Sequence, residues 1–426
     1  MIRGRYTYVE MCHDFLPVYT GSRCLLHGCS PYDPNALYRE FVSAGGRGYN
    51  PRLWTNGVSV YPPTTFLVVL PLASLPISTM DVLWMALVLA SVCGTSLLMA
   101  DLASDFALLP AAIPIAILPL ASSIAGMLGQ PAAVEVGIVG FCFWASVRQK
   151  WPWLAAVLLG IGFVFKPQLA VALALWLILQ PGFKRLLATR AVAVAILLTC
   201  TTLAVCAMRP ATRTWLPQLR SSLTVLQQQH HYDANGNETR MFNSNYIGVE
   251  NPDAQLMTNL QVVAAIWSVR RANLVALAVC SVLLAVWGWA WWRVPKNYAT
   301  SLLALGALCP LTFLPVYHRQ YDAALWLIAM PAVAVLWAHN RKWGLAATIV
   351  SVLAAIWTWH RYMQLVGDHV RSQSHFVIAT ALRSPVWASL LLATFFIVAL
   401  ICYRQPRGGR TAAQRSMSTD EALSLA

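Results

Sequence analysis

Residues 82–100 read VLWMALVLASVCGTSLLMA, a run of 19 residues without a charged side chain. An α-helix rises 1.5 Å per residue, so a helix over this run is about 28 Å long. That length is close to the roughly 30 Å thickness of the hydrocarbon core of a bilayer. The run therefore predicts a membrane-spanning helix, and similar runs recur along most of the chain.

Charge-free runs lie on both sides of this segment. Two short ones, 151–165 and 167–183, are separated only by Lys166. The others cover residues 61–77, 106–134, 191–208, 272–292, 297–317, 323–338, 343–359 and 384–403. We predict an all-α integral membrane protein, a multi-span helical bundle with about ten to twelve membrane segments, some of them short or re-entrant.

The composition supports this class. Hydrophobic residues make up 58% of the chain and charged residues 11%, whereas a soluble domain carries roughly 25% charged residues. Thirty Lys and Arg against 16 Asp and Glu give a net charge of +14. No basic stripe interleaves with aromatic residues, so we expect no nucleic-acid partner. The excess charge is typical of loops that orient spans and attract anionic lipids or a phosphorylated substrate.

Two long polar stretches divide the apolar runs. The predicted organisation is an extracytoplasmic loop over 1–60, a first membrane helix group over 61–208, a second extracytoplasmic loop over 209–271, a second membrane helix group over 272–403, and a disordered cytoplasmic tail over 404–426. Cys12, Cys24 and Cys29 cluster in the first loop, and an extracytoplasmic position there permits a disulfide.

The orientation follows from the basic loops, because Lys and Arg concentrate on the cytoplasmic side. Basic residues occupy the tail after 403 and the loops at 341–342, 293–296, 184–190 and 148–150. Alternating spans then gather unusual polar residues at the outer surface. These are Gln130, Lys166, His318, Arg319 and Asp322. An ionisable residue at membrane depth is a functional candidate by default.

Several motifs follow one another in a fixed order. They are HDFLPVY at 13–19, LLHGCSPYDP at 25–34, YPP at 61–63, GQ at 129–130, LLGIGFVFKPQ at 158–168 and YHRQYD at 317–322. Over about residues 12 to 340, this series resembles glycosyltransferase family 87, the polyprenyl-phosphate-mannose-dependent α-(1→2) mannosyltransferases of bacteria. The resemblance implies the GT-C fold and a multi-pass protein of a bacterial-type cell membrane.

The resemblance also implies a reaction. A hexose, mannose in the known subfamily, passes from a polyprenyl-phosphate donor to a lipid-linked or cell-envelope glycan on the outer face, with inversion. Asp14 matches the position of the general base, which takes the proton of the acceptor hydroxyl. The leaving phosphate needs fixed positive charge, which Lys166 and Arg319 supply. His318 is a second catalytic candidate, and the pocket-lining candidates are Gln130, Tyr61, Tyr321, Asp322 and Asp33. We expect neither a metal nor a cofactor, because no Asp-x-Asp pair is present.

Structural roles compete with these assignments. The alternative role of Asp14 and Gln130, which precede predicted helices, is helix capping, and that of Asp33 is to form a turn. The alternative for Lys166 is a side chain that snorkels to the interface, and for His318 a hydrogen-bonded histidine at the interface. The alternative for Asp322 is an ion pair with Arg319, three positions earlier. The competing functional hypotheses are a transporter or lipid flippase and a non-catalytic envelope scaffold. Transporters usually show repeated halves with broken helices at matching positions, and no such repeat is visible.

The thirteen residues before Asp14 are too few to cross a bilayer, whereas family members carry a first span before the Asp-bearing loop. Either the start codon is called too late, or the chain lacks that span. On the first alternative, we expect the upstream reading frame to encode about 20 further apolar residues.

The proposed orientation can be tested by labelling single introduced cysteines with an impermeant maleimide. Cysteines next to Gly129, Lys166 and His318 should react from outside the cell. Cysteines next to Lys184 and Arg341 should react only after the membrane is permeabilised. Labelling of the Arg341 loop from outside would invert the topology and place the candidate residues at the cytosolic surface.

Overall fold

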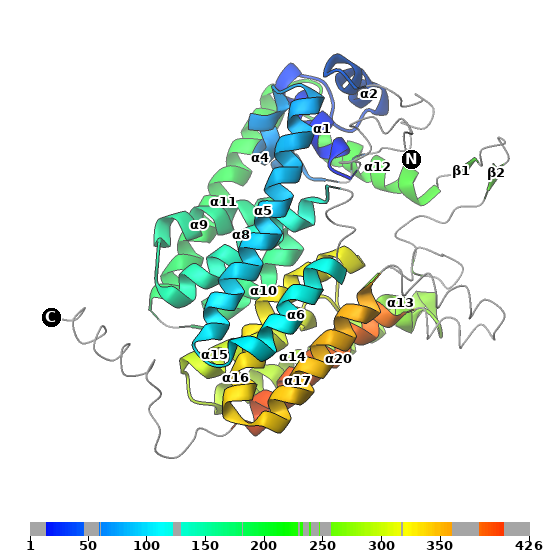
Figure 1. Ribbon diagram of the computed structural model, residues 1–426. Helices are drawn as coiled ribbons and strands as arrows, with labels where there is room; N and C mark the ends of the chain where they lie inside the picture. Colours follow the sequence, from blue (N-terminus) through cyan, green and yellow to red (C-terminus); the bar gives the residue numbers. More distant parts are fainter. Residues whose placement is uncertain are drawn as a thin grey trace, which may run out of the picture.

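The computed structural model describes residues 14–46, 59, 61–121, 129–180, 182–228, 231–232, 238–239, 247, 257–316, 318–359 and 383–403. Helices make up about four-fifths of this part of the chain (Figure 1). Two strands of two residues each, β1 (His231–Tyr232) and β2 (Glu238–Thr239), form an antiparallel pair. The predicted all-helical architecture is therefore confirmed for the described residues.

The helices follow one another along the chain with short connections. They are α1 (Leu16–His27), α2 (Pro34–Ser43), α4 (Pro63–Ala73), α5 (Ile77–Ser104), α6 (Leu108–Ala121), α8 (Pro131–Arg148), α9 (Pro152–Phe165), α10 (Pro167–Ile178), α11 (Phe183–Met208), α12 (Trp215–Gln228), α13 (Gln261–Ala264), η3 (Val269–Arg271), α14 (Ala272–Arg293), α15 (Tyr298–Leu311), η4 (Gln320–Ala329), α16 (Pro331–His339), α17 (Arg341–Thr358) and α20 (Ser384–Cys402).

Five helical segments of the described chain are long and apolar enough to cross a bilayer. They are α5, α8, α11, α20 and the continuous segment from η3 through α14. The pair η4 and α16, bent by 42°, makes a sixth if it is one broken span. Shorter apolar helices, such as α9 and α10, lie between them. The chain is a membrane protein by these segments, while the total of ten to twelve stays a prediction.

Helices α9 and α10 meet at Lys166, where the sequence predicts two short runs. Pro167 has no N–H to continue the helix, and a residue before proline is driven out of the helical region. Lys166 accordingly has φ −145° and ψ 73°. The hydroxyls of Thr64 and Thr65 in α4 donate to the carbonyls of Val164 and Phe165, at 3.0 and 3.2 Å. Another helix therefore satisfies carbonyls next to the break.

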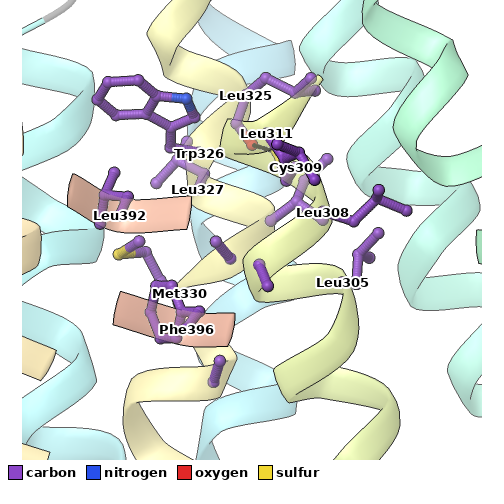
Figure 2. Packing of buried hydrophobic residues seen from close by; sticks show 14 of the residues in the cluster. Leu305, Leu308, Cys309, Leu311, Leu325, Trp326, Leu327, Met330, Leu392 and Phe396 are labelled. Atoms are coloured by element: carbon purple, nitrogen blue, oxygen red, sulfur yellow. Dashed lines mark hydrogen bonds between the residues drawn. The ribbon is translucent and has the colours of Figure 1, made fainter. Parts of the chain in front are cut away.

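The 3-10 helix η4 packs against α15 on one side and against α8 and α6 of the first helix group on the other. Its apolar side chains belong to one cluster with those of α15 and α20 (Figure 2). A Cβ built on Gly306 of α15 would lie 2.9 Å from the Cβ of Ala332, so the glycine lets α15 and α16 approach closely. The Sγ of Cys309 also donates to the carbonyl of Leu325 at 3.4 Å. Packing on all sides fixes the first turn of η4, which carries polar residues.

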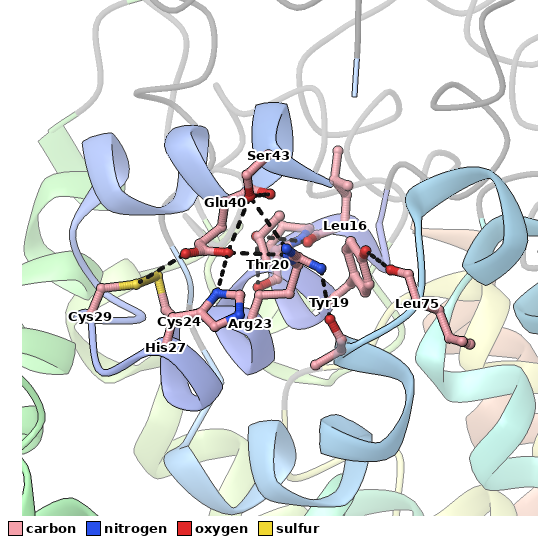
Figure 3. Close-up of polar contacts among 12 residues, drawn as sticks. Leu16, Tyr19, Thr20, Arg23, Cys24, His27, Cys29, Glu40, Ser43 and Leu75 are labelled. Carbon is pink, nitrogen blue, oxygen red and sulfur yellow. Dashed lines mark hydrogen bonds and ion pairs between the residues drawn. A yellow bond between two sulfur atoms is a disulfide. The ribbon is translucent and has the colours of Figure 1, made fainter. Parts of the chain in front are cut away.

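Helices α1, α2 and α4 lie together at one end of the molecule (Figure 1). Arg23 of α1, only 8% exposed, connects all three. Its guanidinium donates to Glu40 Oε2 of α2 at 3.1 Å and to the carbonyl of Ala73 of α4 at 2.8 Å (Figure 3). His27 Nδ1 lies 2.9 Å from the same Glu40 oxygen. This buried polar cluster fixes the segment that follows Asp14.

A disulfide joins Cys24 in α1 to Cys29 just after it. Gly28 between them ends the helix in the left-handed conformation, with φ 81°, which glycine adopts without steric cost. The structure thus pairs two members of the predicted cysteine cluster. Cys12 lies outside the described residues. Disulfides persist in oxidising compartments, which is consistent with an extracytoplasmic N-terminal region.

Arg23→Met should lower the free energy of unfolding by about 3 kcal/mol, because it leaves the Glu40 carboxylate without its guanidinium partner. The value is at the low end of the range for buried pairs, since the two side chains keep 10% and 13% of their exposure. Denaturant titration in mixed micelles measures it. Arg213→Met, at an exposed arginine, is the control and should change stability by less than about 0.5 kcal/mol. Equal effects would mean that the cluster adds no stability.

Candidate functional site

Lys166 occupies the backbone break between α9 and α10, so its side chain is not part of a helix surface. The residue is 9% exposed, and its Nζ donates to Asp322 Oδ1 at 2.6 Å. Lys166 therefore does not snorkel to an interface but forms a buried ion pair. The two residues are 156 positions apart in the sequence, and their contact connects the first helix group to the second.

The first turn of η4 supplies the acid of this pair, and the residues just before it supply a histidine. Asp322 Oδ2 accepts from the backbone N–H of Arg319 at 3.1 Å and lies 3.1 Å from His318 Nδ1. A carboxylate only accepts hydrogen bonds, so Nδ1 of a neutral His318 carries the proton. Asp322 thus receives three hydrogen bonds, including one from Lys166. We call Lys166, Asp322 and His318 the polar triad.

His318 is fully buried, and burial lowers the pKa of its imidazole below the ordinary value of 6.5, outweighing the neighbouring Asp322. The ring is therefore neutral at pH 7. With the proton on Nδ1, Nε2 presents a lone pair, and it has no hydrogen-bond partner among the residues that the structure describes. A buried acceptor without a partner is costly, by about 1–3 kcal/mol, and is suited to receive a ligand's hydroxyl.

Two aromatic rings position the triad. Phe313 stacks on the His318 ring with centroids 4.3 Å apart and an interplanar angle of 19°. The ammonium of Lys166 lies 5.5 Å from the centroid of the Tyr321 ring, within the range of a cation–π contact. The site thus combines a fixed cation, a fixed acceptor and flat apolar surfaces.

The end of the second polar stretch lies against the triad. Met257 forms an antiparallel bridge with Arg319, and the Thr258 N–H donates to the carbonyl of His318 at 2.9 Å. The Leu260 N–H donates to the carbonyl of Leu314 at 2.8 Å. Backbone pairing therefore brings residues 257–260 beside the start of η4, a proximity that the sequence analysis did not predict.

Glu135 lies one turn inside α8 and is fully buried. Neither of its carboxylate oxygens has a hydrogen-bond partner in the described part of the chain. A Cβ on Gly162 of α9 would lie 2.4 Å from Glu135 Oε1, so only glycine leaves room for this carboxylate. Lys166 is the cation whose field acts on it. A second acidic group therefore lies within the electrostatic range of the lysine.

The remaining candidates lie around the helix starts near Lys166. Gln130 is the N-cap residue of α8 and is 3% exposed, but its side chain makes no capping hydrogen bond. The carbonyl of Gly129 accepts from Trp84 Nε1 at 2.5 Å, and Trp84 stacks on Phe15. This stack places the start of α1, and hence Asp14, beside the start of α8.

Tyr61 lies just before α4, and its carbonyl accepts from Tyr32 Oη at 2.9 Å. Asp33 is the N-cap of α2, where its side chain accepts from the Asn35 N–H at 2.9 Å. The hydrogen bond of Asp33 is therefore a helix-capping contact, which is the structural alternative to its predicted role in a pocket. Asp14 is half-buried and precedes Phe15, which is the N-cap of α1.

Some of the candidate residues therefore contact one another directly, and others are connected only by the packing of neighbouring residues. Lys166, His318 and Asp322 contact one another, Tyr321 lies against the lysine, and Arg319 contributes its backbone amide. Phe15, which follows Asp14, and Phe165, which precedes Lys166, belong to one hydrophobic cluster, and Tyr61 packs against it. Asp322 thus forms an ion pair with Lys166, a partner that the spacing in the sequence did not suggest.

A family model described as glycosyltransferase family 87 matches residues 60–315, more than half of the 426 residues. The chain belongs to this family. The resemblance seen in the motifs is confirmed over that range, and the protein is a membrane glycosyltransferase. Neither the curated proteins nor the solved structures contain a match.

The range matched to family 87 includes Tyr61, Gln130 and Lys166. It ends before His318 and Asp322 and begins after Asp14. The family membership thus covers the cation of the polar triad, and the contacts in the structure extend the site to the first turn of η4.

Replacing one partner of the Lys166–Asp322 ion pair should lower the free energy of unfolding more than replacing both. Lys166→Met alone or Asp322→Leu alone leaves one buried charge without its partner and should destabilise the protein by about 3–5 kcal/mol. The double variant should cost less than either single one. Unfolding in mixed micelles measures all three. Lys150→Met, at an exposed lysine, is the control and should cost less than about 0.5 kcal/mol. Additive single effects would contradict the coupling.

Proposed function

We propose that this protein transfers a hexose, with mannose as the first candidate, from a polyprenyl-phosphate sugar to a lipid-linked or cell-envelope glycan. The observation that carries the proposal is the polar triad at the break between α9 and α10, in a chain of glycosyltransferase family 87. The lysine is buried, so its charge acts on a phosphate with little screening by water.

The positive charge is assigned to the leaving group. During transfer the bond between the sugar C1 and the phosphate oxygen breaks, and the phosphodiester leaves as a phosphate monoester with one more negative charge. Lys166 stabilises that charge, since only one of its three N–H groups is used by Asp322. Arg319 adds a second positive charge at the start of η4. Asp322 and Tyr321 hold the ammonium in place.

The acceptor side needs a base. The acceptor oxygen forms the new bond to C1 from the face opposite the phosphate, which inverts the configuration, and its proton passes to a carboxylate. Asp14 is assigned this role because it is half-buried and because the next residue, Phe15, stacks on Trp84, whose indole donates to the carbonyl of Gly129 beside the start of α8. Gln130 and Tyr61 are assigned to the lining of the sugar pocket.

The extracytoplasmic face is part of the proposal. The disulfide between Cys24 and Cys29 lies on the helix that directly follows Asp14, and disulfides are maintained outside the cytosol. The basic loops place the same region outside. Donor sugars carried by a polyprenyl phosphate are accessible to an active site at that surface.

The test is transfer by purified protein supplied with labelled polyprenyl-phosphate hexoses and envelope lipids. Asp14→Asn should lower turnover by about 10²- to 10⁴-fold, because the amide cannot take the acceptor proton, while donor binding is kept. Asp33→Asn is the matched control and should stay close to wild type, since Asn caps a helix as well as Asp. An active Asp14→Asn protein together with an inactive Asp322→Asn protein would move the base to Asp322.

A further inference from the structure

Thr258 and His318 face each other across a short antiparallel pairing. Met257 bridges Arg319, and the Thr258 N–H donates to the His318 carbonyl, so Thr258 and His318 are the next directly opposed residues. Opposed residues on antiparallel strands project to the same side, with Cβ atoms about 5 Å apart. The hydroxyl of Thr258 therefore lies on the side that carries the imidazole of the polar triad.

Both side chains are fully buried, and each has a polar atom without a hydrogen-bond partner in the described residues. The atoms are Thr258 Oγ1 and His318 Nε2. The buried Thr202, by contrast, satisfies its hydroxyl locally, by donating to the carbonyl of Leu198 at 2.7 Å. Leaving two adjacent polar atoms unmatched is costly, by roughly 1–3 kcal/mol each, so the pair is matched to something that the protein binds.

The two atoms have complementary chemistry. His318 Nε2 only accepts, because the proton of the neutral ring is on Nδ1 and is held by Asp322. Thr258 Oγ1 donates one hydrogen bond and accepts others. A ligand hydroxyl placed between them donates its proton to Nε2 and accepts the proton of Oγ1. A phosphate oxygen does not fit this pair, since it has no proton to give to Nε2.

We propose that Thr258 and His318 form a subsite for one hydroxyl group of a hexose, beside the phosphate site of Lys166. This inference rests on the proposed function and adds to it a residue that fixes the sugar ring. Because Asp322 contacts both Lys166 and His318, the same carboxylate positions the phosphate-binding cation and the hydroxyl acceptor. The subsite makes the enzyme specific for a sugar that bears a hydroxyl at one particular ring position.

The test combines Thr258 variants with a panel of monodeoxy hexosyl donors and monodeoxy acceptors. In the wild type, one deoxy analogue should lose about 10- to 100-fold in kcat/KM. Thr258→Val, which removes the hydroxyl and keeps the shape, should lose a similar factor with the complete sugar and nothing further with that analogue. Thr258→Ser should retain most of the activity. Thr202→Val is the matched control and should discriminate among the analogues as the wild type does.

The subsite is refuted if Thr258→Val discriminates among all analogues as the wild type does, because the hydroxyl then contacts no sugar. A wild type that transfers no hexose from any donor would refute the proposed function instead. In that case equilibrium binding of the same panel tests the subsite. The subsite is supported if the wild type binds one analogue more weakly than the complete sugar and Thr258→Val shows no such difference. It is refuted if the wild type binds all members of the panel with equal affinity.

Discussion

A positive charge inside an apolar helix bundle needs a partner, and the Lys166–Asp322 ion pair meets that need here. The 2.6 Å contact joins the first helix group to the second, because Lys166 follows the last residue of α9 and Asp322 lies in the first turn of η4. Other features depend on it. The proline that follows Lys166 frees the lysine from the helix, and the packing of η4 against α15 and α8 fixes its partner. The site therefore lies where the break between α9 and α10 meets the start of η4.

The sequence predicts the parts of the site that local rules determine. Charge-free runs predict the helices, Pro167 predicts the break at Lys166, and the alternation of basic loops brings Lys166, His318 and Asp322 to one side. The pairing of Asp322 is not local. Spacing suggests Arg319 three residues earlier, and nothing local suggests the contact with a lysine 156 positions away. Only tertiary packing creates that contact.

Thr258 and Glu135 are two residues whose surroundings could not be predicted from the sequence. Thr258 follows a long polar stretch without periodicity, so only the backbone pairing with His318 reveals its place. Glu135 stands out in the sequence as a charge within an apolar run, but its packing against Gly162 is needed to show that the helices leave room for it. The cysteines near residue 24 are intermediate, since the sequence predicts a disulfide but does not choose the pair.

The 156 residues between Lys166 and Asp322 also have a consequence for biosynthesis. A ribosome adds roughly 5–20 residues per second, so the lysine is synthesised roughly 10–30 s before its counter-ion. During that interval α9 and α10 enter the membrane with an uncompensated ammonium between them. The flexible lysine stem lets the charge stay near the lipid headgroups until η4 arrives. The burial of Lys166 is thus a late step of assembly, and the first helix group is inserted before the polar triad exists.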